Sequence, residues 1–315
     1  MEKENVQQKY MGSAMLRREK KKSKMIELLF VMSIIIYPLI NFIVFYVIQN
    51  FNSILLVFQS YDSEYNRIWV GLANFKIFFE ELFAPESSYL LSIGRSVLDF
   101  VIGIVISRPI GIIFAFFVYK KARLSGGLRY VSMLPSIISG VLVAMMFMKF
   151  VNAMPEFMAG LGIKDFPKLL QDKRTRYFMT IFYGFWSGFG SSIIYYSNAM
   201  NAINDELVES AQLDGITYGK ELLYITIPMI FPTISTFIIT SVTGLFAASG
   251  PLFMFWKFDA PADTLRFGYV MYRMTMEDGT ISYPIVATMG MVLTLVTFPI
   301  TLGVRWLMDR LDPNN

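Results

Sequence analysis

The chain has 315 residues, a formal net charge of +4 and a hydrophobic content of 55%. With a mean hydropathy of +0.50 it is too apolar for a soluble domain of this length, which indicates an integral membrane protein. The absence of cysteine and histidine excludes disulfides, thiolate metal sites and imidazole catalysis, and we expect no bound metal. No GxxxxGK(S/T) phosphate loop occurs, so the chain is not expected to hydrolyse ATP itself.

Residues 1–25 form a polar, basic tail. The apolar run after it is too long for the core of a signal peptide and is not followed by a small-residue cleavage site. We therefore interpret the tail as a cytoplasmic topology anchor, in preference to a lipid-binding or nucleic-acid-binding segment. Its basic residues are Arg17, Arg18, Lys20, Lys21, Lys22 and Lys24.

Six apolar stretches follow, each close to the roughly 20 residues that cross a bilayer as a helix. They predict an all-α membrane protein with six transmembrane helices. The stretches are Ile26–Ile48, Val97–Tyr119, Tyr130–Phe150, Tyr177–Met200, Ile227–Phe255 and Tyr283–Leu307.

The second stretch contains two charged residues, Asp99 and Arg108. An ionised group in the bilayer core costs at least about 2.5–3.5 kcal/mol on insertion scales, so each needs a partner or water. Their spacing does not place them on one helix face, and Pro109 predicts a kink beside the arginine. We favour an ion pair with another helix. The alternatives are a position near the membrane surface or a role in a polar pathway.

The fourth stretch has one face of small and polar residues at helical spacing, from Gly184 to Asn198. Hydroxyl groups in the fifth stretch lie at comparable depth, and neither stretch is charged, which favours a neutral polyol as solute. An aromatic ring could stack on a sugar. The alternative is helix packing with hydroxyls that bond to their own backbone. The candidate path residues are Tyr183, Trp186, Ser187, Ser191, Tyr195, Thr240, Ser241 and Ser249.

The stretch Asn201–Pro232 is polar and lies between two apolar runs. Asn204 or Asp205 can cap a helix whose first turns are acidic, and Gly215 then breaks that helix. A second helical run, Tyr218–Tyr224, leads to the next apolar stretch. The pattern predicts a helix, a glycine bend and a second helix outside the membrane, which could dock on another protein.

The spacing Glu209-Ser210-Ala211, three residues, Gly215, nine residues, then Ile225-Thr226-Ile227-Pro228 resembles the EAA signature of bacterial ABC importer permeases. The family consensus is Glu-Ala-Ala, x3, Gly, x9, Ile-x-Leu-Pro, so Ser210 and Ile227 are mild departures. Asp214 and the lead-in Asp205-Glu206-Leu207 are similar to the sugar-importing, maltose-permease branch. By this resemblance the ATPase-coupling residues are Asp205, Glu206, Glu209, Ser210, Ala211, Asp214 and Gly215.

The resemblance implies a type I ABC importer permease fold, with a permease domain at 26–307, a coupling loop at 201–227 and a cytoplasmic tail at 308–315. Implied partners are a second permease subunit, two ATPase subunits that bind ATP and Mg, an extracellular solute-binding protein and membrane lipid. Trp186 followed by Gly188, Gly190, Ser191 and Ser192 resembles permeases for oligo- and polysaccharides, so an oligosaccharide is the expected solute. Transport would proceed by alternating access in the bacterial cytoplasmic membrane.

Lysine and arginine near the predicted span ends indicate the orientation. The N-terminal tail, the loop at 120–129 and the tail after the sixth stretch are basic, so both termini and the coupling loop are predicted to be cytoplasmic. The basic loop Asn152–Arg176 is an exception to this rule. Two alternatives remain: a permease for a non-sugar solute, and an ion-coupled secondary transporter, for which the expected inverted repeats are not evident.

Overall fold

The computed structural model describes residues 24–85 and 87–313. Arg17, Arg18, Lys20, Lys21 and Lys22 of the basic tail lie outside the described residues. The described chain is mainly helical, which confirms the predicted all-α class. The exception is a short antiparallel hairpin, β1 (Gln59–Tyr61) and β2 (Arg67–Trp69), in which Gln59 pairs with Trp69.

A single helix, Lys24–Leu56, precedes the hairpin and contains η1 (Phe42–Ile48) and α2 (Gln49–Leu56). The remaining helical elements follow in chain order. They are α3 (Ala73–Leu82), α4 (Ser88–Ile102), η2 (Gly103–Ser107), α5 (Arg108–Tyr119), α6 (Ser125–Ile137), α7 (Gly140–Gly160), α8 (Arg176–Met200), α9 (Asp205–Leu213), α10 (Tyr218–Glu221), η3 (Leu222–Thr226), α11 (Ile227–Met229), α12 (Phe231–Thr243), α13 (Leu252–Trp256), η4 (Ala262–Thr264), α14 (Phe267–Glu277), η5 (Gly279–Ser282) and α15 (Tyr283–Leu311).

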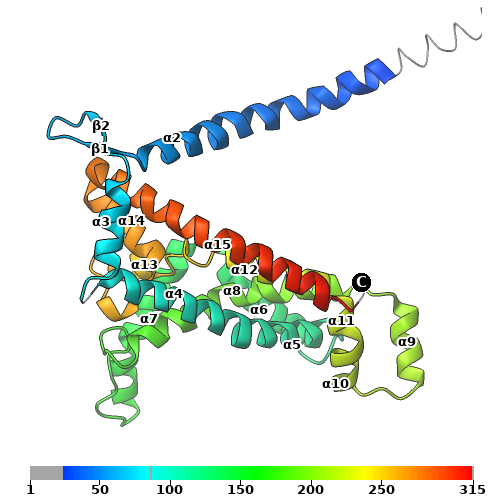
Figure 1. The fold of residues 1–315 in the computed structure, drawn as a ribbon. Helices are drawn as coiled ribbons and strands as arrows, with labels where there is room; N and C mark the ends of the chain where they lie inside the picture. The colour runs from blue at the N-terminus through cyan, green and yellow to red at the C-terminus, as the bar shows by residue number, and fades with distance from the viewer. Residues whose placement is uncertain (1–23, 86, 314–315) are drawn as a thin grey trace, which may run out of the picture.

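The long helices run side by side between two ends of the molecule (Figure 1). One end carries α3, α13, α14 and the β-hairpin, and the other carries α9 and α10 together with the end of α15. The helix Lys24–Leu56 projects away from the rest and meets α15 through α2. Its apolar side chains are exposed along its length, as expected of a span that faces lipid or another subunit.

The predicted second and sixth stretches are confirmed as parts of long apolar helices, Ser88–Tyr119 and Gly279–Leu311, and the first as part of Lys24–Leu56. The predicted third span, Tyr130–Phe150, is wrong. Its two halves belong to α6 and α7, which are separated at Ile138, where the backbone is extended. With 13 residues, α6 is about 20 Å long, too short for a hydrocarbon core of roughly 30 Å.

The predicted fifth span, Ile227–Phe255, is not one continuous helix. The helical segments Tyr218–Met229 and Phe231–Thr243 meet at a bend of 67°, consistent with the prolines at that point. After Thr243 the chain turns, and Gly250 has a φ of +60°. Within the described residues, four helices are long and apolar enough to cross a membrane, or up to five if the bent pair counts as one span. The predicted count of six is therefore not confirmed.

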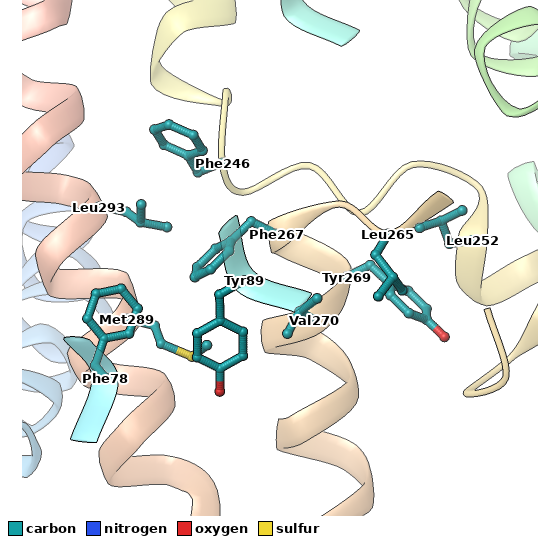
Figure 2. Packing of buried hydrophobic residues seen from close by; sticks show 10 residues of the cluster. All are labelled: Phe78, Tyr89, Phe246, Leu252, Leu265, Phe267, Tyr269, Val270, Met289 and Leu293. Carbon is teal, nitrogen blue, oxygen red and sulfur yellow. The ribbon is translucent and has the colours of Figure 1, made fainter. Parts of the chain in front are cut away.

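Buried apolar clusters hold the helices in place. Figure 2 shows the cluster at the α3–α13–α14 end, where Tyr89 of α4 meets Phe267 of α14 edge to face at 5.9 Å, beside Met289 of α15. A second cluster joins α5, α8, α9 and the segment before α12, and a third joins α7, α8 and α13. Helix α8 takes part in two of these clusters, so its orientation is fixed from both sides.

Two glycines permit close approach of the helices around α8. A Cβ atom at Gly190 would overlap the backbone carbonyl of Ser132 in α6. A Cβ atom at Gly111 of α5 would lie 3.3 Å from the Cβ of Ser192 in α8. Gly190 and Ser192 of the fourth stretch therefore pack against neighbouring helices, although neither belongs to the predicted small and polar face.

Candidate functional site

A cavity of about 480 Å³ lies among α4, η2, α5, α8, α12 and the turn after α12. Its volume is in the usual range for small-molecule sites. Gly184 and Gly188 of α8 line it, and a Cβ atom at either position would meet open space within the described chain. The π-helical stretch η2 forms part of the opposite wall, an irregularity often found at functional sites. The polar lining includes Asp99, Arg108, Ser192, Ser241 and Arg266.

Asp99 of α4 forms an ion pair with Arg266, the residue before α14. The hydroxyl of Tyr177 donates to Oδ1 of Asp99 at 2.7 Å, and Nη2 of Arg266 donates to Oγ1 of Thr180 at 3.0 Å. Arg266 is 4% exposed. The favoured interpretation of Asp99, an ion pair with another helical element, is therefore confirmed. The partner, Arg266, lies between the predicted fifth and sixth stretches.

Arg108 is differently placed. Its Nη2 donates to the hydroxyl of Ser241 in α12, and its Nη1 donates to the hydroxyl of Tyr196 in α8 at 3.4 Å. Its guanidinium carbon lies 5.8 Å from the ring centroid of Phe237. No carboxylate pairs with Arg108 in the part of the chain that the structure describes. The expectation that ion pairing would explain both buried charges is therefore wrong for this residue.

Of the predicted path residues, all of which the structure describes, Ser241 alone lines the cavity. Tyr183 is buried with Phe147 and Phe255, and Trp186 lies 5.9 Å from Phe147 between ring centroids, so both rings belong to an aromatic cluster. The hydroxyls of Ser187 and Thr240 bond to carbonyls of their own helices. Ser191, Tyr195 and Ser249 also lie outside the cavity lining.

The cavity carries charged side chains, unlike the two stretches on which the expectation of an uncharged path depended. That expectation rested on the absence of charge from the fourth and fifth stretches, which α8 and α12 contain. The structure adds Arg108 from α5, Asp99 from α4 and Arg266 from the segment before α14 to the same cavity. The sequence did contain a signal, because Asp99 and Arg108 stood out as charges within an apolar run.

The loop between α8 and α12 has the predicted helix–bend–helix form. The side chain of Asn204 caps α9 by accepting from the backbone N–H of Glu206 at 3.0 Å. At the other end, Gly215 has a φ of +77°, and the N–H of Ile216 donates to the carbonyl of Ala211 at 3.1 Å. Together with the bond from the N–H of Gly215 to the carbonyl of Gln212 at 3.0 Å, this bond forms a Schellman motif, which requires a left-handed residue such as glycine. The second run is split into α10 and the π-helical η3.

The predicted coupling residues lie together on the outer side of this loop. Asp205, Glu206, Glu209 and Asp214 are exposed, so α9 and its end present an acidic surface. Ser210 and Gly215 are also exposed, and Ala211 is half-buried. The apolar side chain of Leu213 is 90% exposed. This combination of acidic and apolar groups is suited to contact with another protein.

The inner side of the loop is attached to the helices. Val208 of α9 packs into the cluster that contains Met200 and Ile230. Glu221, at the end of α10, is 1% exposed and forms an ion pair with Lys120, directly after α5. The ammonium of Lys120 also lies 5.2 Å from the ring centroid of Tyr119. Sequence reasoning missed this pair, because nothing in either segment indicates its partner.

A helical membrane fold with a solute-sized cavity, a bent span and an exposed acidic loop is consistent with a transport permease. The chain belongs to the family of binding-protein-dependent transport system inner membrane components, which matches residues 107–315. It is therefore a multi-pass membrane protein and a permease component of such a system, as the EAA-like spacing predicted.

Individual relatives agree with this assignment. The chain is 24% identical over 257 residues to the multiple sugar-binding transport system permease protein MsmF of Streptococcus mutans, an alignment covering 79% of this chain and 85% of that one. It is 25% identical over 270 residues to the galactooligosaccharides transport system permease protein GanP of Bacillus subtilis, covering 79% and 63%. The fold resembles a chain in the crystal structure of a bacterial ABC transporter that imports the acidic polysaccharide alginate. The TM-score is 0.77 and the identity 21%, and the match covers 93% of this chain and 99% of that one.

Proposed function

We propose that this chain is a permease subunit of an ATP-driven importer that moves a carbohydrate, in particular an oligosaccharide, across the bacterial cytoplasmic membrane. The observation that carries the proposal is the set of relatives aligned over about four fifths of the chain, which are named for sugar and galactooligosaccharide transport. The cavity supports it, because its hydroxyl groups can exchange hydrogen bonds with a polyol.

The working complex contains this chain, a second permease subunit, two ATPase subunits and an extracellular solute-binding protein. The exposed acidic side of α9 supports an ATPase contact, since a basic patch on that subunit would complement it. A similar fold occurs in a bacterial alginate ABC transporter whose structure was solved in complex with a periplasmic protein. The match covers 90% of this chain at 19% identity, with a TM-score of 0.77. The ATPase binds ATP and Mg, and this chain makes and breaks no covalent bonds.

Coupling follows from how α9 and α10 are attached. Closure of the ATPase dimer moves the loop, and α11 and α12 carry that movement towards the cavity past the 67° bend. The start of the helix Lys24–Leu56, the end of α15 and α9 lie towards one end of the molecule, which supports a cytoplasmic position for both termini (Figure 1).

An ion-coupled transporter would need an ionisable group that is free to exchange protons or ions. Asp99 is the acid within the cavity lining of the described chain, and it is held by Arg266 and by the Tyr177 hydroxyl. That placement favours a structural role over a relay. No specific observation favours a non-sugar solute.

The test is co-purification of the tagged chain in mild detergent, followed by an ATPase assay on the material recovered. We expect a second permease and an ATPase to co-purify, and ATP hydrolysis to rise when an oligosaccharide-loaded binding protein is added. Purification of the chain alone, with vesicle uptake that follows an ion gradient in the absence of ATP, would overturn the proposal.

A further inference from the structure

We propose that the cavity accepts an anionic carbohydrate, one that bears a carboxylate as a uronic acid unit does, and that Arg108 binds this carboxylate. The inference rests on the proposed function and deepens it by naming the chemical class of the sugar. It starts from the balance of charge in the cavity. Asp99 and Arg266 form an ion pair and neutralise each other, whereas Arg108 adds one positive charge.

The hydrogen bonds of Arg108 leave part of its guanidinium free. A guanidinium has five N–H groups, and the described partners are two neutral hydroxyls, those of Ser241 and Tyr196. Nε is buried and has no partner among the described residues. Arg108 as a whole is half-buried, and a cation with only neutral neighbours lacks compensation, which is costly in a membrane. A bound anion would supply that compensation.

The surroundings of Arg108 hold it in one orientation. The Ser241 hydroxyl accepts from Nη2 of Arg108 and donates to the carbonyl of Phe237 at 2.8 Å. The Phe237 ring lies beside the guanidinium carbon. A planar guanidinium held in this way can bind both oxygens of a carboxylate, whereas an isolated ammonium cannot match that geometry.

The cavity also provides room and polarity for the rest of the sugar. Gly184 and Gly188 have no side chains to fill the α8 wall of the cavity. Asp99 lies nine positions before Arg108, about 13 Å along the helix at 1.5 Å per residue. The carboxylate is therefore favoured at the Arg108 end, because the Asp99–Arg266 pair at the other end carries no net charge, so an acidic sugar would bind with a defined orientation.

A second buried donor points to the same class of ligand. Arg266 is 96% buried, as its 4% exposure shows, and its Nη1 has no partner among the described residues although the side chain lines the cavity. Asp99 neutralises its charge, so Nη1 is suited to a neutral acceptor such as a sugar hydroxyl. Arg108 remains the cationic group of the cavity without an acidic partner in the described chain.

The experiment compares two sugars that differ only in charge: an oligosaccharide containing uronic acid, and the same oligosaccharide after reduction of its carboxyl groups to alcohols. ATP-driven uptake is measured in proteoliposomes that contain the complete transporter, with the solute-binding protein saturated by each sugar. We expect Arg108→Gln to lower uptake of the acidic sugar roughly 10- to 150-fold, the range given by loss of a charged hydrogen bond. Uptake of the reduced sugar should change less than about threefold.

Two further variants keep the test informative if Arg108→Gln assembles poorly. Arg108→Lys retains the charge without the planar fork and should restore part of the uptake of the acidic sugar. Ser241→Ala retains the arginine and removes a hydroxyl that orients it, so it should cause a smaller loss. Assembly and the midpoint of thermal unfolding are measured for each variant.

The outcomes separate this inference from the proposed function. Equal losses for both sugars would overturn it, because Arg108 would then serve structure or pair with an acidic residue of the second permease. Uptake of only the reduced sugar, or uptake of the acidic sugar that is insensitive to Arg108, would also overturn it while leaving carbohydrate import intact. If wild-type protein imports neither sugar but another solute in an ATP-dependent way, the proposed function itself fails.

Discussion

The ion pair between Lys120 and Glu221 should dominate the stability of the junction between α5 and the coupling loop. Glu221 is 1% exposed and Lys120 is 15% exposed, measured on the side chains. Removal of one partner from a buried ion pair costs about 3–5 kcal/mol, because the other charge is left uncompensated. The two single substitutions are not equivalent here. The lysine has a long stem that can carry its ammonium to water, whereas the carboxylate has no such route.

We therefore expect Lys120→Met to destabilise the protein by about 3–5 kcal/mol and Glu221→Gln by about 1–2 kcal/mol. The double variant Lys120→Met with Glu221→Leu should lie close to wild type, since apolar residues of similar size can replace a buried pair. The matched control is Lys220→Met, which removes an exposed lysine adjacent to Glu221 and should change stability by less than about 0.5 kcal/mol.

The assay is equilibrium unfolding of the purified transporter in mixed micelles, followed through the free energy of unfolding. A Lys120→Met variant no less stable than Lys220→Met would refute the reasoning, because the carboxylate would then be solvated rather than buried. If the double variant is stable, its ATPase activity can be compared with its transport. Hydrolysis without transport would show that the pair connects loop movement to α5, beyond its effect on stability.

Three further predictions concern single positions. Gly215→Ala should strain the left-handed bend by about 1–2 kcal/mol, whereas Gly215→Asn should keep it; loss of substrate-stimulated ATPase activity in both would indicate that a side chain obstructs the docked ATPase. Gly190→Ala should lower stability by about 1–3 kcal/mol by forcing α6 from α8, whereas Gly188→Ala should leave the unfolding midpoint unchanged. Burial raises the pKa of Asp263, but the hydrogen bonding and charge of Arg176, a backbone hydrogen bond and the charge of Lys173 together hold that pKa below 3.8. The stability difference between Asp263→Asn and wild type should therefore be present at pH 6–7 and shrink as the pH falls below 3.8.

The parts of the fold that were predicted correctly are determined by residues that lie close together in the sequence. Asn204 and Gly215 determine the start and end of α9 through bonds that span at most five residues. A cap or a left-handed turn needs only the residue type and its local backbone. The EAA-like spacing is local in the same sense. These features were therefore accessible without any knowledge of tertiary contacts.

The parts that were wrong depend on where an apolar run is interrupted. Tyr130–Phe150 contains Pro135 and Gly140, yet its composition is that of a span, and the extended backbone at Ile138 divides it. Hydropathy averages over a window and does not register a single residue that leaves the helical conformation. The bend before α12 coincides with prolines that can be read from the sequence, whereas the end of that helix at Thr243 has no such marker.

The cavity could not be predicted because its polar groups come from elements far apart in the sequence. Arg108 and Ser241 are 133 residues apart, and Asp99 and Arg266 are 167 residues apart. A charged residue in an apolar run indicates that the charge has a partner, because an unpaired charge is costly in the low dielectric of the membrane. The charge alone does not identify the partner. Asp99 and Arg108, which are both charges within one apolar stretch, differ in this respect. Among the described residues, Asp99 pairs with a basic residue, whereas Arg108 has neutral neighbours: two hydroxyls and the Phe237 ring. The one that stayed without an acidic partner is the one through which this chain can discriminate between solutes, because a cation already neutralised would gain little from an anionic ligand.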